Sequence, residues 1–352
     1  MKIVYIILAV VAAVALAVVV LIQSWANTKY GRLDTRAAIF VKLVAISGAG
    51  AGDKSLTELR KVSNAGSLKI TSVPEPFSNM KNITIPGPVE KIPIRIYTPE
   101  QSHNSPIILF FHGGGWATGS IDTVDSICRL IAKKGSAIVV SVEYRLAPEN
   151  PFPAGLNDCY AALCWTYQNA QSIGGDPRRI AVAGNSAGAN LATAVALMAR
   201  DKNGPPIIAQ SLMYPVTNSW STDTESQAKF GKDFYLSTKQ IESFNDGYVP
   251  RREDRKNPLV SPLLADNLKG LPPALVVTAE FDPLRDEGEA YVKRMREAGV
   301  PVVHTRYKGM IHGFVGMGRF LPQAGQAIDE MTGFLKKQFD AGEKVSTRLD
   351  QR

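Results

Sequence analysis

The chain has 352 residues, 45% hydrophobic and 20% charged, which is enough apolar content for a large core and unlike the composition of a disordered protein. Its formal net charge is +8, but the basic residues are scattered without a long run of like charge, which argues against a nucleic acid partner. Its three cysteines, Cys128, Cys159 and Cys164, have no metal-ligand or CxxC spacing. An odd number excludes a disulfide framework, and Cys159 and Cys164, in a helix-like stretch, are predicted to be buried free thiols.

The first element is an apolar segment from Ile3 to Ile22 that contains no charged residue, proline or glycine. As a helix, a segment of about 20 residues extends about 30 Å, which matches the core of a bilayer. A cleaved signal peptide is the alternative, because Ser24 and Ala26 are small residues at suitable positions before a cleavage point. The apolar part of a signal peptide is usually about 7 to 15 residues, however. Residues 1–26 are therefore predicted to be a single-pass membrane anchor, with a secreted or periplasmic protein as the alternative, and the flanking charges do not fix its orientation.

Residues 27–90 hold an amphipathic stretch, Ala37 to Ile46, and polar turns, and they are predicted to be a linker and the N-terminal part of a cap. From Ile92 onwards, short apolar runs alternate with helical patterns. The expected strands are 92–97, 107–111, 137–142, 180–183, 211–214, 274–278 and 302–307, and the expected helices are 127–134, 157–168, 187–199 and 288–298. This alternation is typical of a mostly parallel sheet covered by helices on both faces. The sequence thus predicts an α/β fold, with residues 91–214 and 273–340 as the two parts of its core.

The alternation of strands and helices stops between Tyr214 and Pro272, where the chain is polar and rich in charge. A long insertion at the carboxyl edge of a parallel sheet lies where ligands bind. Residues 215–272 are therefore predicted to form a helical cap with the N-terminal segment. Residues 341–352 are predicted to be a polar C-terminal tail.

The strongest chemical signal is the segment Gly184-Asn185-Ser186-Ala187-Gly188, between an expected strand and an expected helix. Glycines on both sides of a serine leave room for a sharp strand-to-helix turn, which lifts the hydroxyl out of the sheet. Ser186 is therefore the predicted nucleophile. The amide after a nucleophile in such a turn commonly helps to bind the negative oxygen of the reaction, which gives Ala187 that expected role.

A serine hydroxyl needs a base, usually a histidine that a carboxylate orients. Of the four histidines, His312 alone follows an expected strand as a loop residue, since His103 lies in a polar turn, His304 inside a strand and His112 before a glycine run. The carboxylate should follow a strand between the serine and the histidine. Asp282 satisfies this, whereas Glu280 and Asp286 are more easily explained as turn or helix-start acids.

A glycine run, Gly113 to Gly115, follows the expected strand 107–111 and lies between His112 and Trp116. Unhindered backbone N–H groups of glycines can converge on one oxyanion, and each such donor is worth about 3 kcal/mol. A phosphate-binding loop is the alternative, but the lysine and the serine or threonine that a nucleotide loop requires do not follow.

Together these segments, with Glu143 to Glu149, Asp282 to Asp286 and His312 to Phe314, resemble the hormone-sensitive lipase family of α/β-hydrolases, which includes bacterial family IV carboxylesterases and arylacetamide deacetylase. The resemblance runs from about Ile92 to the C-terminal helix. It implies a triad of Ser186, Asp282 and His312, a cap over the acyl pocket, and oxyanion donors at Gly113, Gly114 and Ala187, although the sequence does not decide which two of the three glycines donate. Asn185 and Glu143 stand where the family commonly has aspartate, and Ala189 where glycine is common.

The predicted function is that of a serine carboxylesterase, which cleaves a small-molecule ester through an acyl-enzyme on Ser186 and uses no metal or organic cofactor. Two alternatives stay open. The first is an amidase or deacetylase that acts on acylated amines, because the motifs do not fix the leaving group. The second is a non-catalytic binding protein of this fold, although such proteins usually lose a triad residue. The acyl chain length and the oligomeric state cannot be predicted from the sequence.

Overall fold

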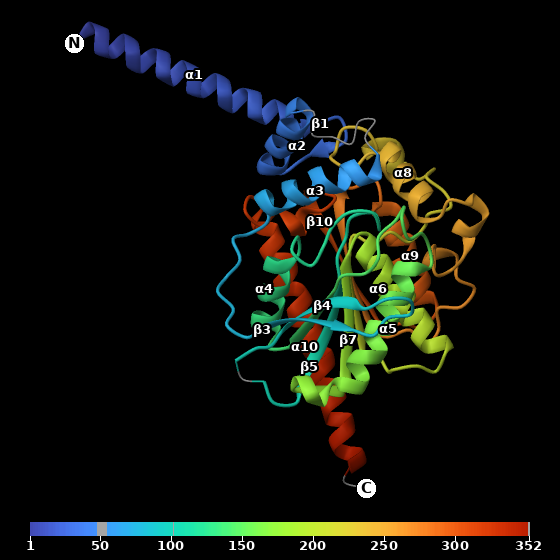
Figure 1. Ribbon diagram of the computed structural model, residues 1–352. Helices are drawn as coiled ribbons and strands as arrows, with labels where there is room; N and C mark the ends of the chain where they lie inside the picture. The colour runs from blue at the N-terminus through green and yellow to red at the C-terminus, as the bar shows by residue number, and fades with distance from the viewer. Residues whose placement is uncertain (48–54, 101, 351–352) are drawn as a thin grey trace.

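The computed structural model describes residues 1–47, 55–100 and 102–350, and its centre is an eight-stranded sheet in the order β10-β9-β8-β7-β5-β6-β4-β3 (Figure 1). The strands are β3 (Met80–Ile85), β4 (Ile92–Tyr97), β5 (Ser105–Phe111), β6 (Ile138–Val142), β7 (Gly175–Asn185), β8 (Ala209–Met213), β9 (Ala274–Phe281) and β10 (Val302–Ile311). The strands β5 to β10 pair in parallel, whereas β4 runs antiparallel to β6 and β3 runs antiparallel to β4. The predicted mostly parallel α/β sheet is therefore confirmed.

Helices cover both faces of this sheet, because the strands in its middle are apolar on both sides. One face packs against α5 (Ala154–Asn169), α6 (Ala187–Asp201) and α9 (Arg285–Glu297), and the other against α4 (Asp125–Gly135) and α10 (Pro322–Asp350). The predicted C-terminal tail thus continues α10 as far as Asp350.

The edge strand β3 lies within the segment that the sequence predicts to be a linker and part of the cap. It was missed because only Ile85 of its six residues is buried, so the strand lacks a clear alternation of apolar and polar side chains. Cys164 is a second difference. Cys128 and Cys159 are buried as free thiols, but Cys164 is only partly buried, so the prediction for Cys164 is wrong.

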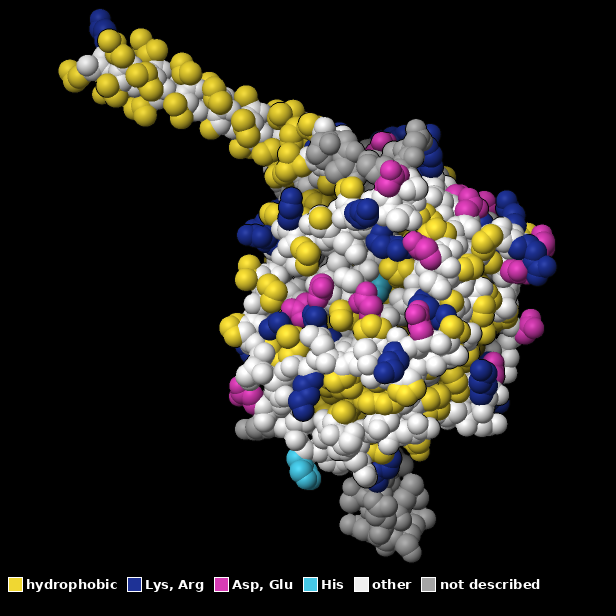
Figure 2. Space-filling model, in the orientation of Figure 1, with side chains coloured by type: hydrophobic (Ala, Val, Ile, Leu, Met, Phe, Trp, Pro, Cys, Tyr) yellow, Lys and Arg dark blue, Asp and Glu magenta, His cyan; other side chains and the backbone are white. Residues whose placement is uncertain are grey.

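The N-terminal helix α1 (Lys2–Ala26) projects from the domain with an apolar surface along its length (Figures 1 and 2). Its last residue, Ala26, is buried, and the Ala26 carbonyl accepts a hydrogen bond from the N–H of Leu33 at 2.9 Å. A short hairpin of β1 (Asn27–Thr28) and β2 (Gly31–Arg32) connects α1 to α2 (Thr35–Ser47). The base of α1 is therefore attached to the domain through hydrogen bonds and packing.

Two helices from the N-terminal part, α2 and α3 (Leu56–Ile70), lie over the same end of the sheet as α8 (Thr238–Tyr248) (Figure 1). The segment after β8 also contains α7 (Glu225–Phe230) and the short 3-10 helices η2 (Arg252–Lys256) and η3 (Pro262–Leu264). Two further 3-10 helices, η1 (Gln171–Ile173) and η4 (Phe314–Met317), lie outside this segment. Arg60 holds α3 on the core, since its guanidinium donates to the carbonyls of Ala117 at 2.6 Å and Ala147 at 2.8 Å. We call α2, α3 and residues 215–272 the cap.

Candidate active site

Ser186 lies in a tight turn between β7 and α6, with φ 55° and ψ −122°. A positive φ at a residue other than glycine is uncommon and strained. The two flanking glycines make the turn possible. A Cβ on Gly184 would lie 2.4 Å from the backbone of Gly188, and one on Gly188 would lie 2.0 Å from the carbonyl oxygen of Phe111. Side chains at either position would push the helix away from the sheet.

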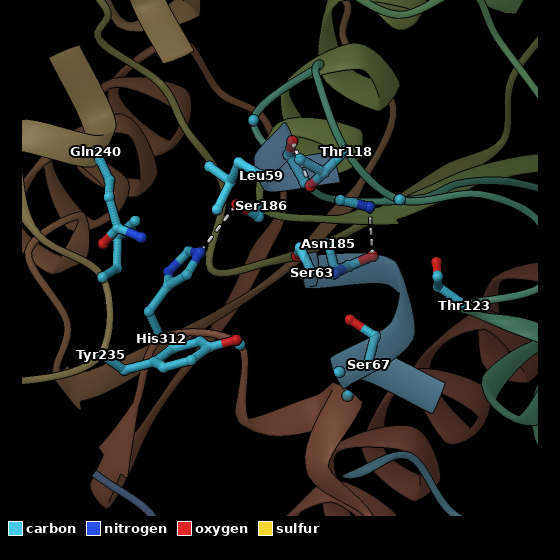
Figure 3. Close-up of a pocket in the computed structure, with 18 of the residues that line it drawn as sticks. Leu59, Ser63, Ser67, Thr118, Thr123, Asn185, Ser186, Tyr235, Gln240 and His312 are labelled. Atoms are coloured by element: carbon cyan, nitrogen blue, oxygen red, sulfur yellow. Dashed lines mark hydrogen bonds between the residues drawn. The ribbon is translucent and has the colours of Figure 1, made fainter. Parts of the chain in front are cut away.

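The structure brings together Ser186, His312 and Asp282 in the order that the sequence predicts. The Oγ of Ser186 lies 2.9 Å from Nε2 of His312, and Nδ1 of His312 lies 2.7 Å from Oδ2 of Asp282 (Figure 3). Asp282 directly follows β9 and is fully buried, and its Oδ1 accepts the N–H of Leu284 at 2.8 Å. His312 directly follows β10. The carboxyl ends of β7, β9 and β10 therefore present a hydrogen-bonded serine, carboxylate and histidine at one edge of the sheet.

The other three histidines are placed where they cannot act as the base for Ser186. His103 is exposed in a turn, and His304 lies on β10, where its Nε2 is 3.0 Å from Oγ1 of Thr278. His112 is fully buried, its ring stacks on Tyr144 and its Nδ1 lies 2.9 Å from the carbonyl oxygen of Gly113. Burial lowers the pKa of His112 to about 4, so its imidazole is neutral near neutral pH and has a structural place beneath the glycine run.

The two competing carboxylates also have other partners. Glu280 accepts the N–H of Gly309 at 2.7 Å, and Asp286 accepts the N–H of Ser226 at 2.7 Å and pairs with Arg285. Asp282 is the acid in contact with His312.

The glycine run after β5 wraps towards Ser186, with positive φ at Gly114, Gly115 and Trp116. The N–H of Gly113 donates to Oδ1 of Asn185 at 3.0 Å (Figure 3). This contact argues against the expectation that Gly113 donates to an oxyanion, because its proton is already engaged. Among the described residues, the N–H groups of Gly114 and Gly115 have no acceptor. The sequence does not predict that Asn185 accepts a hydrogen bond from Gly113. The only indication is that Asn185 lies next to the nucleophile.

Glu287 is a buried carboxylate near the site, and no sequence motif marks it. Its Oε1 accepts the N–H groups of Thr217 at 2.7 Å and Asn218 at 3.1 Å, while Oε2 has no partner among the described residues. Burial, together with the charge of Asp282, raises the pKa of Glu287 to about 8. A neutral Glu287 in the first turn of α9 thus ties the start of the cap insertion to this helix.

The buried Glu287 gives the protein a stability that depends on pH. Its folded pKa is raised, so between about pH 5 and pH 8 the folded chain keeps a proton that the unfolded chain releases, and stability falls as pH rises. In Glu287→Gln the amide oxygen can accept the same two N–H groups without titrating. We expect the free energy of unfolding of the wild type, relative to the variant, to fall by about 2–4 kcal/mol over that range.

Urea unfolding of the full chain in detergent at a series of pH values measures this difference. Contributions from His112 and other groups are common to both proteins and cancel. If the difference in free energy of unfolding between the two proteins did not change with pH, Glu287 would be ionised in the folded protein.

A cavity of about 750 Å³ opens in front of Ser186 and His312. This volume is within the range of about 300–1,000 Å³ for small-molecule sites. The cap supplies much of its wall, including Phe40 of α2, Leu59 and Ile70 of α3, and Ile241 and Phe244 of α8. Figure 3 shows Ser63 and Ser67 of α3 across the cavity from His312. None of these cap residues belongs to a sequence motif, so the sequence alone does not predict that they line the cavity.

Trp116 lines the same cavity and stacks on Tyr248 of α8, with ring centroids 4.3 Å apart. Trp116 therefore both lines the cavity and packs against the cap. Within the described residues, no group of three His, Cys, Asp or Glu side chains is arranged to hold a metal ion.

Comparison with known proteins gives the family. A family model described as the alpha/beta hydrolase fold matches residues 108–316. Carboxylic ester hydrolase LipN of Mycobacterium tuberculosis is 43% identical over 270 residues, which are 75% of this chain and 71% of LipN. Carboxylesterase NlhH of the same organism is 42% identical over 71% of this chain and 79% of its own length.

Solved structures agree with this result. A hyperthermophilic esterase from Pyrobaculum calidifontis superimposes with a TM-score of 0.83 at 37% identity and covers 87% of this chain and 98% of its own. EstE1, a thermostable carboxylesterase from a metagenomic library, has a TM-score of 0.79 at 42% identity over 81% of this chain and 98% of its own. The chain belongs to the α/β-hydrolase fold family, and the predicted resemblance to its hormone-sensitive lipase group is confirmed.

Proposed function

We propose that Ser186 is the nucleophile of this enzyme, His312 its general base and Asp282 the carboxylate that orients His312. The observation that supports these roles is the continuous chain of contacts, 2.9 Å from Ser186 to His312 and 2.7 Å from His312 to Asp282. In this arrangement Nδ1 of His312 donates to Asp282, which leaves Nε2 free to accept the proton of Ser186.

The enzyme is a carboxylic ester hydrolase. Ser186 attacks the ester carbonyl while His312 takes its proton, and the tetrahedral intermediate expels the alcohol, to which His312 returns the proton. The resulting acyl-enzyme is then hydrolysed by a water molecule that His312 deprotonates. Every proton transfer in this cycle passes through one imidazole, whose cation the buried Asp282 stabilises.

The negative oxygen of the intermediate is stabilised by the backbone N–H groups of Gly114, Gly115 and Ala187 in this proposal. Ala187 begins α6, so its N–H is one of the amides that a helix leaves without an intrahelical acceptor. Gly113 has a different role, since its hydrogen bond to Asn185 fixes the glycine run next to the nucleophile turn. The side-chain oxygen of either asparagine or aspartate at position 185 can accept this N–H. Asparagine in place of the family's usual aspartate is therefore compatible with activity.

The domain organisation proposed from the sequence fits this site, with one change. Residues 91–214 and 273–340 carry the nucleophile, the base and the acid, while the cap closes the acyl pocket. Within residues 27–90, α2 and α3 belong to the cap and β3 belongs to the sheet.

We further propose that α1 is retained as a membrane anchor. Its 25 residues suit a membrane span by length and composition, and they also suit a signal sequence. The burial of Ala26 and its hydrogen bond to Leu33 support retention, because cleavage after Ala26 would remove a residue that packs in the core.

A fluorophosphonate probe tests the catalytic assignment, since it forms a stable bond only with an activated serine. We expect one adduct per chain, which peptide mapping places on Ser186. Ser63 and Ser67 line the same cavity but make no hydrogen bond to a histidine among the described residues, so they serve as internal controls. Labelling of either control serine, or no labelling of the folded protein, would contradict the proposal.

A further inference from the structure

We propose that the pocket opens at the membrane surface, so that the enzyme takes long-chain acyl esters dissolved in the bilayer as substrates. This inference depends on the proposed function, because it names the substrate class of the same site and uses α1 as a retained anchor.

The anchor is joined to the pocket wall by a very short connection. α1 ends at Ala26 and α2 begins at Thr35, and the residues between them form a hydrogen-bonded hairpin. Arg32 of this hairpin reaches back to α1, where it donates to Gln23, and to Asn27. A flexible tether would let the catalytic domain move away from the bilayer, but this connection keeps α2 at its surface.

The two helices next to the anchor form one side of the cavity. Phe40 and Val44 of α2 and Val62, Gly66 and Ile70 of α3 all line it. Figure 1 shows α2 and α3 at the end of the domain from which α1 projects, with the end of α10 on the opposite side. The wall of the active-site cavity therefore faces the membrane that α1 would enter.

Large apolar side chains are exposed on the outer surface of these helices. Leu43 and Ile46 of α2 are 59% and 76% exposed, and Leu68 of α3 is 53% exposed. Exposed apolar side chains that gather on a surface mark interaction sites. Figure 2 shows apolar side chains along α1 up to the domain, and α2, which carries Leu43 and Ile46, is in contact with α1. The occupant that fits this arrangement is the acyl boundary of the bilayer.

The charges around the cavity agree with a lipid surface. Lys61 and Lys69 of α3 are exposed and line the cavity, and Lys42 of α2 is exposed next to Leu43. No aspartate or glutamate lines the cavity in the described parts of the chain. Basic side chains beside apolar ones are typical of segments that lie at an anionic membrane interface.

The test uses the full chain reconstituted in vesicles of phosphatidylcholine and phosphatidylglycerol, with two esters that share a leaving group. p-Nitrophenyl palmitate is dissolved in the vesicles, and p-nitrophenyl acetate is dissolved in the water. In Leu43→Ser/Ile46→Ser we expect at least about a fivefold lower rate on the palmitate and a change of less than about twofold on the acetate. The control is Tyr167→Ser/Val303→Ser, two residues 40% and 49% exposed on α5 and β10 near the other end of the sheet, which should leave both rates unchanged.

The outcomes separate this inference from the proposed function. Equal palmitate rates in the two double variants, or hydrolysis of the acetate without hydrolysis of the palmitate, would overturn the membrane-facing pocket alone. Failure of the wild type on both esters would instead contradict the proposed function. If Leu43→Ser/Ile46→Ser changed the oligomeric state without a selective loss of palmitate hydrolysis, the surface would instead bind a second copy of the chain. If the purified protein began after Ala26, α1 would not be a retained anchor and the inference would be wrong.

Discussion

Replacing Ser186 with alanine is expected to lower kcat for p-nitrophenyl acetate by at least about 10⁴-fold. The change removes the Oγ that lies 2.9 Å from Nε2 of His312, so no acyl-enzyme can form. The backbone amides of the oxyanion site remain in the variant and can still stabilise an oxyanion. We therefore expect a small residual rate that is faster than the uncatalysed hydrolysis in water. Initial rates over a range of ester concentrations measure the effect.

Ser63→Ala is the matched control, because Ser63 lines the same cavity from α3 and has no histidine partner among the described residues. We expect its kcat to stay within about threefold of the wild type, since it loses at most a contact to substrate. Turnover by Ser186→Ala close to that of this control would mean that another residue attacks the ester.

The residues that do chemistry could be predicted because each lies in a short local pattern. The turn around Ser186 needs glycine on both sides for steric reasons, and Asp282 and His312 each follow a strand of the parallel sheet. Parallel strands end at one edge, so residues far apart in the chain meet there. The antiparallel strand β4 also begins and ends at the predicted residues, because isoleucines alternate with other residues along Ile92–Tyr97.

The parts that could not be predicted depend on tertiary contacts without a local pattern. The engagement of Gly113 by Asn185 requires knowledge of how β5 and β7 place their loops side by side. Glu287 has the appearance of an ordinary acid in the first turn of a helix, and only its burial against Thr217 and Asn218 shows otherwise. The residues of α2 and α3 that line the cavity are apolar or small, and many other surfaces have the same composition.

The fold of the cap also explains why its two parts are separate in the sequence. α2 and α3 come before the sheet and α8 comes between β8 and β9, yet α3 and α8 are in contact over the cavity. Phe244 of α8 lies so close to Gly115 that a Cβ there would be 2.2 Å from its ring. A movement of α8 would therefore disturb the glycine run, which couples the shape of the acyl pocket to the proposed oxyanion donors.

Asp282→Asn is expected to lower kcat by about 10⁴-fold while the protein stays folded. The reason is specific to the hydrogen bonds in this site. Oδ1 of Asp282 accepts the N–H of Leu284 at 2.8 Å, so an asparagine would keep its carbonyl oxygen there and turn its amide N–H₂ towards Nδ1 of His312. His312 would then accept at Nδ1 and carry its proton on Nε2, where it could no longer take the proton of Ser186.

Asp286→Asn makes the same chemical change four residues further on and serves as the control. Asp286 pairs with Arg285 and accepts the N–H of Ser226, so its loss should affect local packing and reduce kcat by less than about tenfold. Both variants should give similar melting temperatures and KM values, because neither change removes a group from the acyl pocket. If Asp282→Asn retained a kcat close to that of Asp286→Asn, the tautomer of His312 would have to be set by another group, and the proposed role of Asp282 would be wrong.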